Sequence, residues 1–252
     1  MTTPDATTSD DAPVFRLAFV PGATPGKWVR IWEQRRPDVP LELVALDVAD
    51  CADAVGQGHV QMAITRLPDA LGHGDAGTHH SIDLYEETTV VVVPKDHVLT
   101  AGDEMTLADL ADEQLLWPLD EPLTVPQPPG SAMSHRPETT SDAIELVAAG
   151  IGVLLVPQSL ARLHHRKDLV YRPVTDAPTS TVGLLWPQPT SDLADEFIGI
   201  VRGRKATSSR GRTEEAPKRS AREKAAAKRA AREAAGKIPG KSARRSGRSK
   251  RR

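Results

Sequence analysis

The stretch that decides the fold is residues 145–157, which read ELVAAGIGVLLVP. Its first part continues a helical pattern of apolar residues, and Gly150 stands where a glycine commonly ends a helix. Residues 151–156 then form an apolar run that Pro157 cuts off, as expected of a strand. A helix that passes through one glycine into an apolar strand is a building unit of α/β folds.

The same alternation extends in both directions from this stretch. Apolar or β-branched runs predict strands, and helix caps followed by helical spacing predict helices. The predicted strands cover residues 15–20, 41–46, 60–65, 82–85, 88–93, 115–117, 151–156, 169–172 and 182–186. The predicted helices cover residues 25–35, 49–57, 107–111, 142–149, 159–164 and 192–201, while residues 69–80 and 121–136 are predicted loops. This order predicts an α/β body with parallel strand pairing.

Charge divides the chain into two parts. Hydrophobic residues make up 39% of the 252 residues, which is enough for a globular core, although aromatics supply only 4%. Residues 202–252 hold 20 Lys and Arg against 4 Asp and Glu, whereas residues 1–201 carry a formal charge of −18. Ile238 is the only large apolar residue after Val201, so we predict a disordered basic tail at 202–252. Residues 1–13 are predicted to be disordered as well.

Several function classes find no support in the residues. Cys51 is the single cysteine, and we interpret it as a thiol without a chemical role. The pairs His79-His80 and His164-His165 fit no zinc-ligand spacing, so no metal and no cofactor are expected. Gly22, Gly26 and Lys27 resemble a phosphate loop, but the spacing is one residue short and Trp28 replaces the required hydroxyl residue. We found no catalytic motif and therefore expect a protein that is not an enzyme.

Targeting signals are likewise missing from the pattern. The first residues, MTTPDATTSDDAP, are polar and acidic, which differs from a secretory signal. No apolar run reaches the roughly 18 residues that a membrane-spanning helix needs. The sequence therefore predicts a cytoplasmic protein without a membrane partner, and association with the nucleoid would follow if the tail binds DNA.

Taken together, six stretches resemble the effector-binding domain of LysR-type transcriptional regulators. The strongest match is the stretch 145–157, and the resemblance covers roughly residues 15–201. Residue 61 is Gln where the family usually has Asp. The other matching stretches are FRLAFV at 15–20, RPDVPLEL at 36–43, GHVQMAI at 58–64, TTVVVVPKDH at 88–97 and LADL at 107–110.

The resemblance implies the type 2 periplasmic-binding-protein architecture, in which two Rossmann-like α/β lobes are joined by crossing strands and hold a small effector between them. It places lobe I at about 14–94 and 182–201, and lobe II at about 95–181. Domains of this family commonly pair side by side, so the resemblance also implies a homodimer. About fourteen residues precede the first predicted strand, too few for the family's winged helix-turn-helix. We therefore do not expect sequence-specific operator recognition.

The first-lobe candidates for effector contact follow strand ends. Ala23, Thr24 and Pro25 open the helix predicted at 25–35, where backbone N–H groups and the helix dipole attract anions. The resemblance implies that the matching loop contacts the effector, and the alternative is a plain helix cap without a ligand. Asp47 would accept from a ligand amine or hydroxyl, and Arg66 would hold a carboxylate. A surface ion pair is the alternative for these two residues.

The second-lobe candidates stand opposite that loop in the family fold. Thr139 and Thr140 precede the helix predicted at 142–149, and their hydroxyls suit a polar ligand. Pro118 and Leu119 end the first strand of this lobe, whereas Trp117 is interpreted as a core residue.

The basic tail supplies the candidate nucleic-acid contacts. A segment without aromatic residues binds phosphate backbones with little sequence preference and with steep salt dependence. The alternatives are a solubility tail and an intramolecular partner of the acidic body. The tail residues chosen are Arg219, Arg222, Lys228, Arg229, Arg232, Arg244, Arg245 and Lys250.

Two functions follow from these observations. The first is a regulator or sensor that binds a polar or anionic metabolite between its lobes and contacts DNA or RNA through its tail. The second is a nucleic-acid-associated structural protein whose body no longer binds a ligand.

Overall fold

A computed structural model describes residues 13–67, 78–120 and 123–204. Within these residues the strands form two five-stranded sheets, and both sheets belong to one compact unit of the chain. None of the helices in the described part of the chain is long and apolar enough to cross a membrane. The segments predicted to be disordered, 1–13 and 202–252, lie outside the described residues except for Pro13 and residues 202–204.

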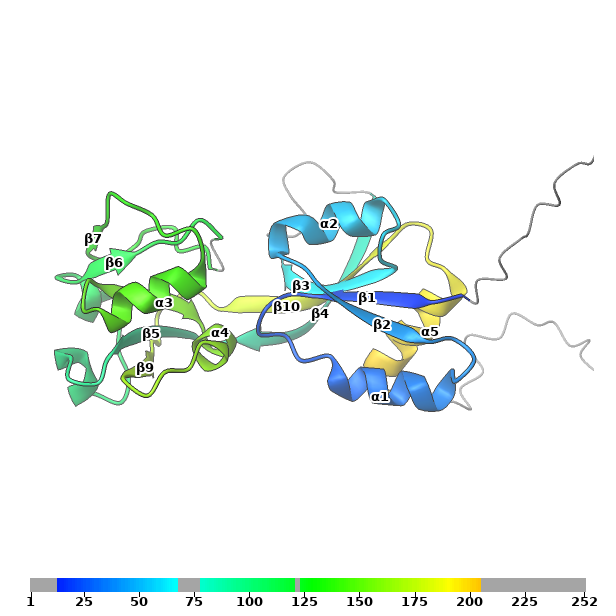
Figure 1. The fold of residues 1–252 in the computed structure, drawn as a ribbon, viewed down its shortest axis with the longest axis horizontal. Helices are drawn as coiled ribbons and strands as arrows, with labels where there is room; N and C mark the ends of the chain where they lie inside the picture. Colours follow the sequence, from blue (N-terminus) through cyan, green and yellow to red (C-terminus); the bar gives the residue numbers. More distant parts are fainter. Residues whose placement is uncertain (1–12, 68–77, 121–122, 205–252) are drawn as a thin grey trace, which may run out of the picture. The chain divides into compact units, whose positions relative to one another are not determined.

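The first sheet has the strand order β2-β1-β3-β10-β4. β1 runs parallel to β2 and β3, while β10 runs antiparallel to β3 and β4. Figure 1 shows helix α2 on one face of this sheet and helices α1 and α5 on the other. The strands are β1 (Phe15–Phe19), β2 (Leu41–Ala45), β3 (Met62–Leu67), β4 (His79–Glu87) and β10 (Ser180–Pro187). The helices are α1 (Gly26–Arg35), α2 (Val48–Gly56) and α5 (Asp192–Val201).

Three aromatic rings join this sheet to helices α1 and α5. Phe15 stacks on Trp32 with ring centroids 4.5 Å apart, and Phe197 lies 5.5 Å from Phe15 and 5.9 Å from Trp32. All three side chains are fully buried. The Trp32 indole N–H donates to the Val39 carbonyl at 2.9 Å, so the polar atom of this ring is satisfied inside the core.

The second sheet has the strand order β7-β6-β8-β5-β9. Val90 and Val92 of β5 pack under helices α3 and α4, while Val91 and Val93 pack with the 3-10 turns on the opposite face. A strand covered on both faces explains the unbroken valine run. The strands are β5 (Thr89–Pro94), β6 (Gln114–Leu116), β7 (Ser131–Ala132), β8 (Val153–Pro157) and β9 (Leu169–Pro173). The helices are η2 (Val98–Ala101), η3 (Leu107–Leu110), α3 (Thr140–Ala148) and α4 (Gln158–Leu163).

The prediction of parallel pairing was wrong for half of this architecture. β6 runs parallel to β7 and β8, but β5 runs antiparallel to both β8 and β9, and β10 is antiparallel in the first sheet. The antiparallel strands are those that follow or precede the passage between the sheets. When the chain crosses from one sheet to the other, the next strand runs opposite to its new neighbours. The hydrophobic pattern of a strand is the same for both strand directions, so it could not predict which strands are antiparallel.

The predicted boundary of lobe I after residue 94 also differs from the sheet membership. β5 belongs to the second sheet, so the chain leaves the first sheet at Glu87 and enters the second at Thr89. It returns between Pro173 and Ser180, close to the predicted return at residue 182. A β-branched strand fits either buried sheet equally well, which is why its composition did not indicate the correct one.

Candidate functional site

The strand order brings several polar loops to a common place. The carboxyl end of β1 in the first sheet leads into residues 21–24, and the carboxyl end of β8 in the second sheet leads into α4. These two segments, together with the end of the crossing strand β4, surround a cleft of about 690 Å³. Its lining comprises Phe19, residues 21–24 and 85–88, Gln158, Ser159, Arg162 and Leu163. A volume of this size accommodates a small metabolite.

Arg66 joins four segments at the base of this cleft. Its guanidinium donates from Nε and Nη2 to one oxygen of Glu87, at 3.2 and 3.1 Å. Nη2 also lies 3.1 Å from the Pro21 carbonyl and 3.1 Å from the Ser159 hydroxyl, both as acceptors. The Arg66 and Glu87 side chains are only 2% and 5% exposed. A buried cation with this many acceptors is positioned by the fold rather than left free for a ligand.

Gly22 lets the first loop approach α4 closely. Its φ is +86°, a conformation that side-chain-bearing residues rarely adopt. A Cβ at this position would lie 2.5 Å from the Ser159 hydroxyl and 3.2 Å from Arg66 Nη2. Real Cβ atoms do not come this close to their neighbours. The close contact between residues 21–24 and α4 therefore requires a glycine at position 22.

The rest of the lining mixes apolar and polar groups. Leu163 is 55% exposed and Tyr85 is 38% exposed, which is unusual for side chains of their size. Partial burial and the nearby Glu87 carboxylate raise the pKa of the Tyr85 hydroxyl, so it remains a neutral hydrogen-bond donor. Arg162 Nε lies 3.3 Å from the Tyr171 hydroxyl. The cleft therefore offers an apolar contact surface beside hydrogen-bonding groups.

The first-lobe candidates separate into two groups. Ala23 and Thr24 line the cleft, whereas the buried Pro25 is not among the lining residues. α1 begins at Gly26 with Pro25 as its N-cap and without a side-chain cap bond, so Thr24 does not cap this helix. The exposed Thr24 hydroxyl is thus not committed to capping.

Arg66 and Asp47 occupy different environments. Arg66 lies against the cleft lining, but its carboxylate partner is Glu87 of the same chain, and the pair is buried rather than on the surface. Asp47 is exposed, is the N-cap of α2 without a side-chain cap bond, and is not a lining residue. The contact of either residue with an effector stays a prediction, which the position of Asp47 does not favour.

The second-lobe candidates bond to their own chain. The Thr139 hydroxyl and the Asp142 carboxylate form a reciprocal capping box at the start of α3. Thr140 is 3% exposed, and its N–H and hydroxyl both donate to Asp120. α3 begins two residues earlier than predicted, and its N-cap is Thr139. None of the second-lobe candidates is in the cleft lining.

Pro118 and Leu119 continue from β6 in the same region. The Pro118 carbonyl accepts from Arg136 Nη2 at 2.7 Å, and the Leu119 N–H donates to the Pro137 carbonyl at 2.9 Å. Pro118 is buried, while the Leu119 side chain is 57% exposed. These backbone contacts hold the loop in place and leave the apolar Leu119 side chain exposed.

The chain matches the family model described as "LysR substrate binding domain" over residues 9–206. The chain belongs to this family. As a LysR substrate-binding domain it is 30% identical over 173 residues to the transcriptional regulator CatR of Pseudomonas putida, which covers 64% of this chain and 57% of CatR. It is 26% identical over 212 residues to the Hca operon activator HcaR of Escherichia coli K12, covering 76% of this chain and 68% of HcaR.

Solved structures confirm the predicted two-lobed fold. The BenM effector-binding domain with benzoate superposes with a TM-score of 0.61 at 21% identity, covering 76% of this chain and 91% of that one. The oxidised form of OxyR superposes with a TM-score of 0.63 at 19% identity, covering 77% and 96%. These likenesses establish the periplasmic-binding-protein type of fold for the LysR substrate-binding domain described here.

Eleven of the thirteen cleft-lining residues were not among the candidates, and four of these eleven matter most for how the cleft is built. Glu87 and Ser159 complete the contacts of Arg66, Gly22 permits the close approach, and Arg162 lines the opposite side. A signal existed for Gly22, because a Pro-Gly pair after a strand commonly forms a turn with positive φ. The other three residues carry no local signal, since each matters only through a segment that lies far away in the sequence.

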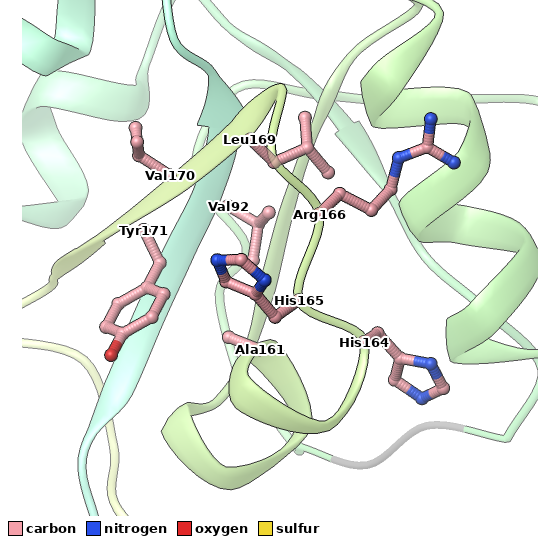
Figure 2. Close-up of a pocket in the computed structure, with 8 residues that line it drawn as sticks. All are labelled: Val92, Ala161, His164, His165, Arg166, Leu169, Val170 and Tyr171. Carbon is pink, nitrogen blue, oxygen red and sulfur yellow. The ribbon is translucent and has the colours of Figure 1, made fainter.

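A second cavity of the LysR substrate-binding domain is too small for a ligand. It measures about 10 Å³, roughly the space of one water molecule, and lies between α4 and β9. Figure 2 shows the His165 ring on the side of Tyr171 and the His164 ring turned away from it. Among the described residues no group of three His, Cys, Asp or Glu side chains could hold a metal ion; His73 lies outside them.

Cys51 is a core residue of the first lobe. It is fully buried on α2, and its thiol donates to the Asp47 carbonyl at 3.3 Å. Burial raises the pKa of the Cys51 thiol above the ordinary value of 9.0. The structure thus places this thiol away from solvent and in its neutral form.

This burial predicts how folding stability depends on pH. Because the folded-state pKa of Cys51 is raised, its contribution is fully present below the unfolded value and is lost as pH rises above about 9. Cys51→Ala is expected to lower the free energy of unfolding by about 1 kcal/mol near neutral pH. Urea unfolding should show the gap between wild type and this variant narrowing at alkaline pH. A gap that widens with pH would contradict the assignment.

Proposed function

We propose that this chain is the effector-binding part of a transcription regulator and that it binds a small polar metabolite in the cleft bounded by residues 21–24, 85–88 and α4. The observation that carries the proposal is the convergence of three segments from both sheets on one cleft of about 690 Å³. A ligand that contacts all three segments favours one arrangement of the sheets, and this difference in affinity is the basis of a signal. In a side-by-side homodimer, a change in the arrangement of the sheets in one chain would be transmitted to the second chain.

The metabolite contacts proposed first are Thr24, Tyr85 and Gln158. Each lines the cleft and carries a hydrogen-bonding side-chain group. Arg66 is not proposed as the anion-binding group, because its charge is already paired with Glu87 inside the protein. Leu163 and Phe19 add apolar contact area on two sides. The arrangement suits a metabolite with an apolar body and a few polar substituents.

Thermal unfolding of the full chain across a metabolite panel tests effector binding. A ligand present at 100 times its Kd stabilises a one-site protein by about 2.7 kcal/mol, which corresponds to roughly 5–10 °C here. Thr24→Trp should abolish the shift by filling the cleft. Gln34→Trp, which adds the same side chain at an exposed position of α1, should preserve it. If no compound raises the Tm, effector binding is wrong and a structural role on nucleic acid is favoured.

We further propose that residues 205–252 give the protein general affinity for nucleic acid. These residues lie outside the described part of the chain, so the proposal rests on their charge. Replacing the eight basic residues named above with Gln in the full chain should weaken binding to duplex DNA and flatten its salt dependence. Fluorescence polarisation with two unrelated duplexes measures both effects. Equal affinity of the variant and the wild type would overturn this proposal, and a strong preference for one duplex would contradict binding without sequence preference.

A further inference from the structure

Three charged side chains line the cleft, and the protein itself neutralises only one of them. Glu87 is buried and paired with Arg66, so its charge is already compensated. The other two are Glu86, which belongs to β4, and Arg162, which belongs to α4. Both of these side chains are exposed. The charges that remain for a ligand are therefore one carboxylate and one guanidinium.

Arg162 keeps donors that suit a carboxylate. Its Nε donates to the Tyr171 hydroxyl at 3.3 Å, which restricts the positions open to the side chain. Within the described residues, its Nη1 and Nη2 groups have no hydrogen-bond or ion-pair partner. A planar guanidinium can donate two parallel N–H bonds to the two oxygens of a carboxylate. Arg162 thus differs from Arg66, whose charge is paired with Glu87.

Glu86 supplies the opposite charge from the other sheet. β4 belongs to the first sheet, whereas α4 follows β8 of the second. The Glu86 carboxylate has no partner among the described residues, and it forms no ion pair with Arg162. An ionised carboxylate only accepts hydrogen bonds, so a ligand ammonium group is a suitable partner. One cleft is therefore lined by two opposite charges that do not neutralise each other.

The apolar part of the lining adds a third requirement. Leu163 follows Arg162 directly and is 55% exposed, and Phe19 lines the cleft from the first sheet. A ligand that is only a carboxylate would be repelled by Glu86, and a ligand that is only an amine would be repelled by Arg162. A ligand with both groups and an apolar body matches all three features.

We infer that the cleft recognises an amino acid with an apolar side chain, with Arg162 binding its carboxylate and Glu86 its ammonium group. This inference rests on the proposed function, because it names the effector class of the same cleft. It makes Arg162 and Glu86 the specificity-determining residues, since each selects one end of the zwitterion.

Calorimetric titration of the full chain tests the effector class with three sets of probes. Each set consists of an amino acid (phenylalanine, leucine or methionine), the same molecule without its amino group, and the corresponding amine without its carboxylate. At least one of the three amino acids should bind. Its acid and amine analogues should each bind about tenfold more weakly, because each lacks one charge-assisted contact.

Two charge-neutralising variants assign the ends of the ligand. Arg162→Gln should weaken binding of the amino acid and of its acid analogue about tenfold without weakening that of the amine. Glu86→Gln should weaken binding of the amino acid and of the amine without weakening that of the acid. Arg30→Gln and Glu33→Gln make the same charge changes on exposed residues of α1 and should leave all three affinities unchanged.

The outcomes separate this inference from the proposed function. An acid analogue that binds as tightly as its amino acid, or a Glu86→Gln variant with wild-type affinity for the amino acid, would overturn the inference. If none of the three amino acids binds while another metabolite raises the Tm, the effector class is wrong and the proposed function stands. If no compound of either kind binds, both fail together.

Discussion

Replacing Arg66 with leucine is expected to lower the free energy of unfolding by about 3–5 kcal/mol, the largest effect predicted for a cleft residue. The substitution removes the partner of Glu87, whose side chain is 5% exposed, and leaves that carboxylate buried without a counter-charge. The Pro21 carbonyl and the Ser159 hydroxyl lose a donor at the same time. Calorimetry of the full chain should show a Tm lowered by roughly 10 °C.

A double variant identifies the cause of this loss. In Arg66→Leu/Glu87→Leu no charge remains buried, and apolar replacements of a buried pair commonly restore much of the stability. We therefore expect the double variant to be more stable than Arg66→Leu alone. If the two variants are equally unstable, the loss comes from packing or from the contacts to Pro21 and Ser159 instead of from the unpaired carboxylate.

Gly22→Val is expected to cost about 2–5 kcal/mol, from backbone strain at positive φ and from a clash with α4. The nearest neighbour of the added Cβ would be the Ser159 hydroxyl at 2.5 Å, with the Ser159 Cβ at 3.0 Å. Urea unfolding measures the loss. Metabolite binding should weaken as well. Gly22 and Ser159 both line the cleft, and the valine side chain would push these two lining residues apart.

Gly26 provides the matched control in the same loop. It is the first residue of α1, and a Cβ there would meet no atom within 4 Å. Gly26→Val should change the free energy of unfolding by less than about 1 kcal/mol. Ser159→Ala should rescue part of the Gly22→Val loss by removing the nearest atom, and the strain of the positive φ should remain. Full rescue would show that the backbone conformation costs nothing here.

The contact region formed by residues 21–22, Glu87 and Ser159 is expected to have two roles. The first is structural, because the buried Arg66 satisfies acceptors in the loop after β1, at the end of β4 and in α4. The second concerns the effector, because the same residues form one end of the cleft. A ligand that moves α4 relative to the first loop would have to stretch the contact between Arg66 and Ser159.

Much of the fold could be predicted from local patterns. α5 has the predicted bounds, residues 192–201, because Ser191 supplies a side-chain cap and the apolar spacing ends at Val201. Gly150 has φ +72°, as expected of a glycine that ends a helix. Thr106 and Asp109 form a local capping box at the start of η3, where a helix was predicted over 107–111 and the structure has a 3-10 turn. Such features depend on neighbours within a few residues, so the sequence displays them directly.

The candidate site was predicted less well, for a physical reason. Thr24 and Ala23 line the cleft, and they could be chosen from the sequence because they follow a strand and precede a helix. The partners of Arg66 are 21 and 93 residues away along the chain, and that of Thr140 is 20 residues away. A charged side chain has the same appearance in a sequence whether its partner is a ligand, another residue or water.

The sequence by itself determined the two α/β halves, the family and the acidic body with its basic tail, because these depend on periodicity, motifs and composition. Only the tertiary structure decided that Arg66 is paired with Glu87, that Gly22 must lack a side chain and that Asp120 occupies the start of α3. Each of these three facts is a short-range interaction between segments that the strand crossings bring together. Hydrogen bonds and steric contacts act over a few ångströms in space, without regard to separation along the chain.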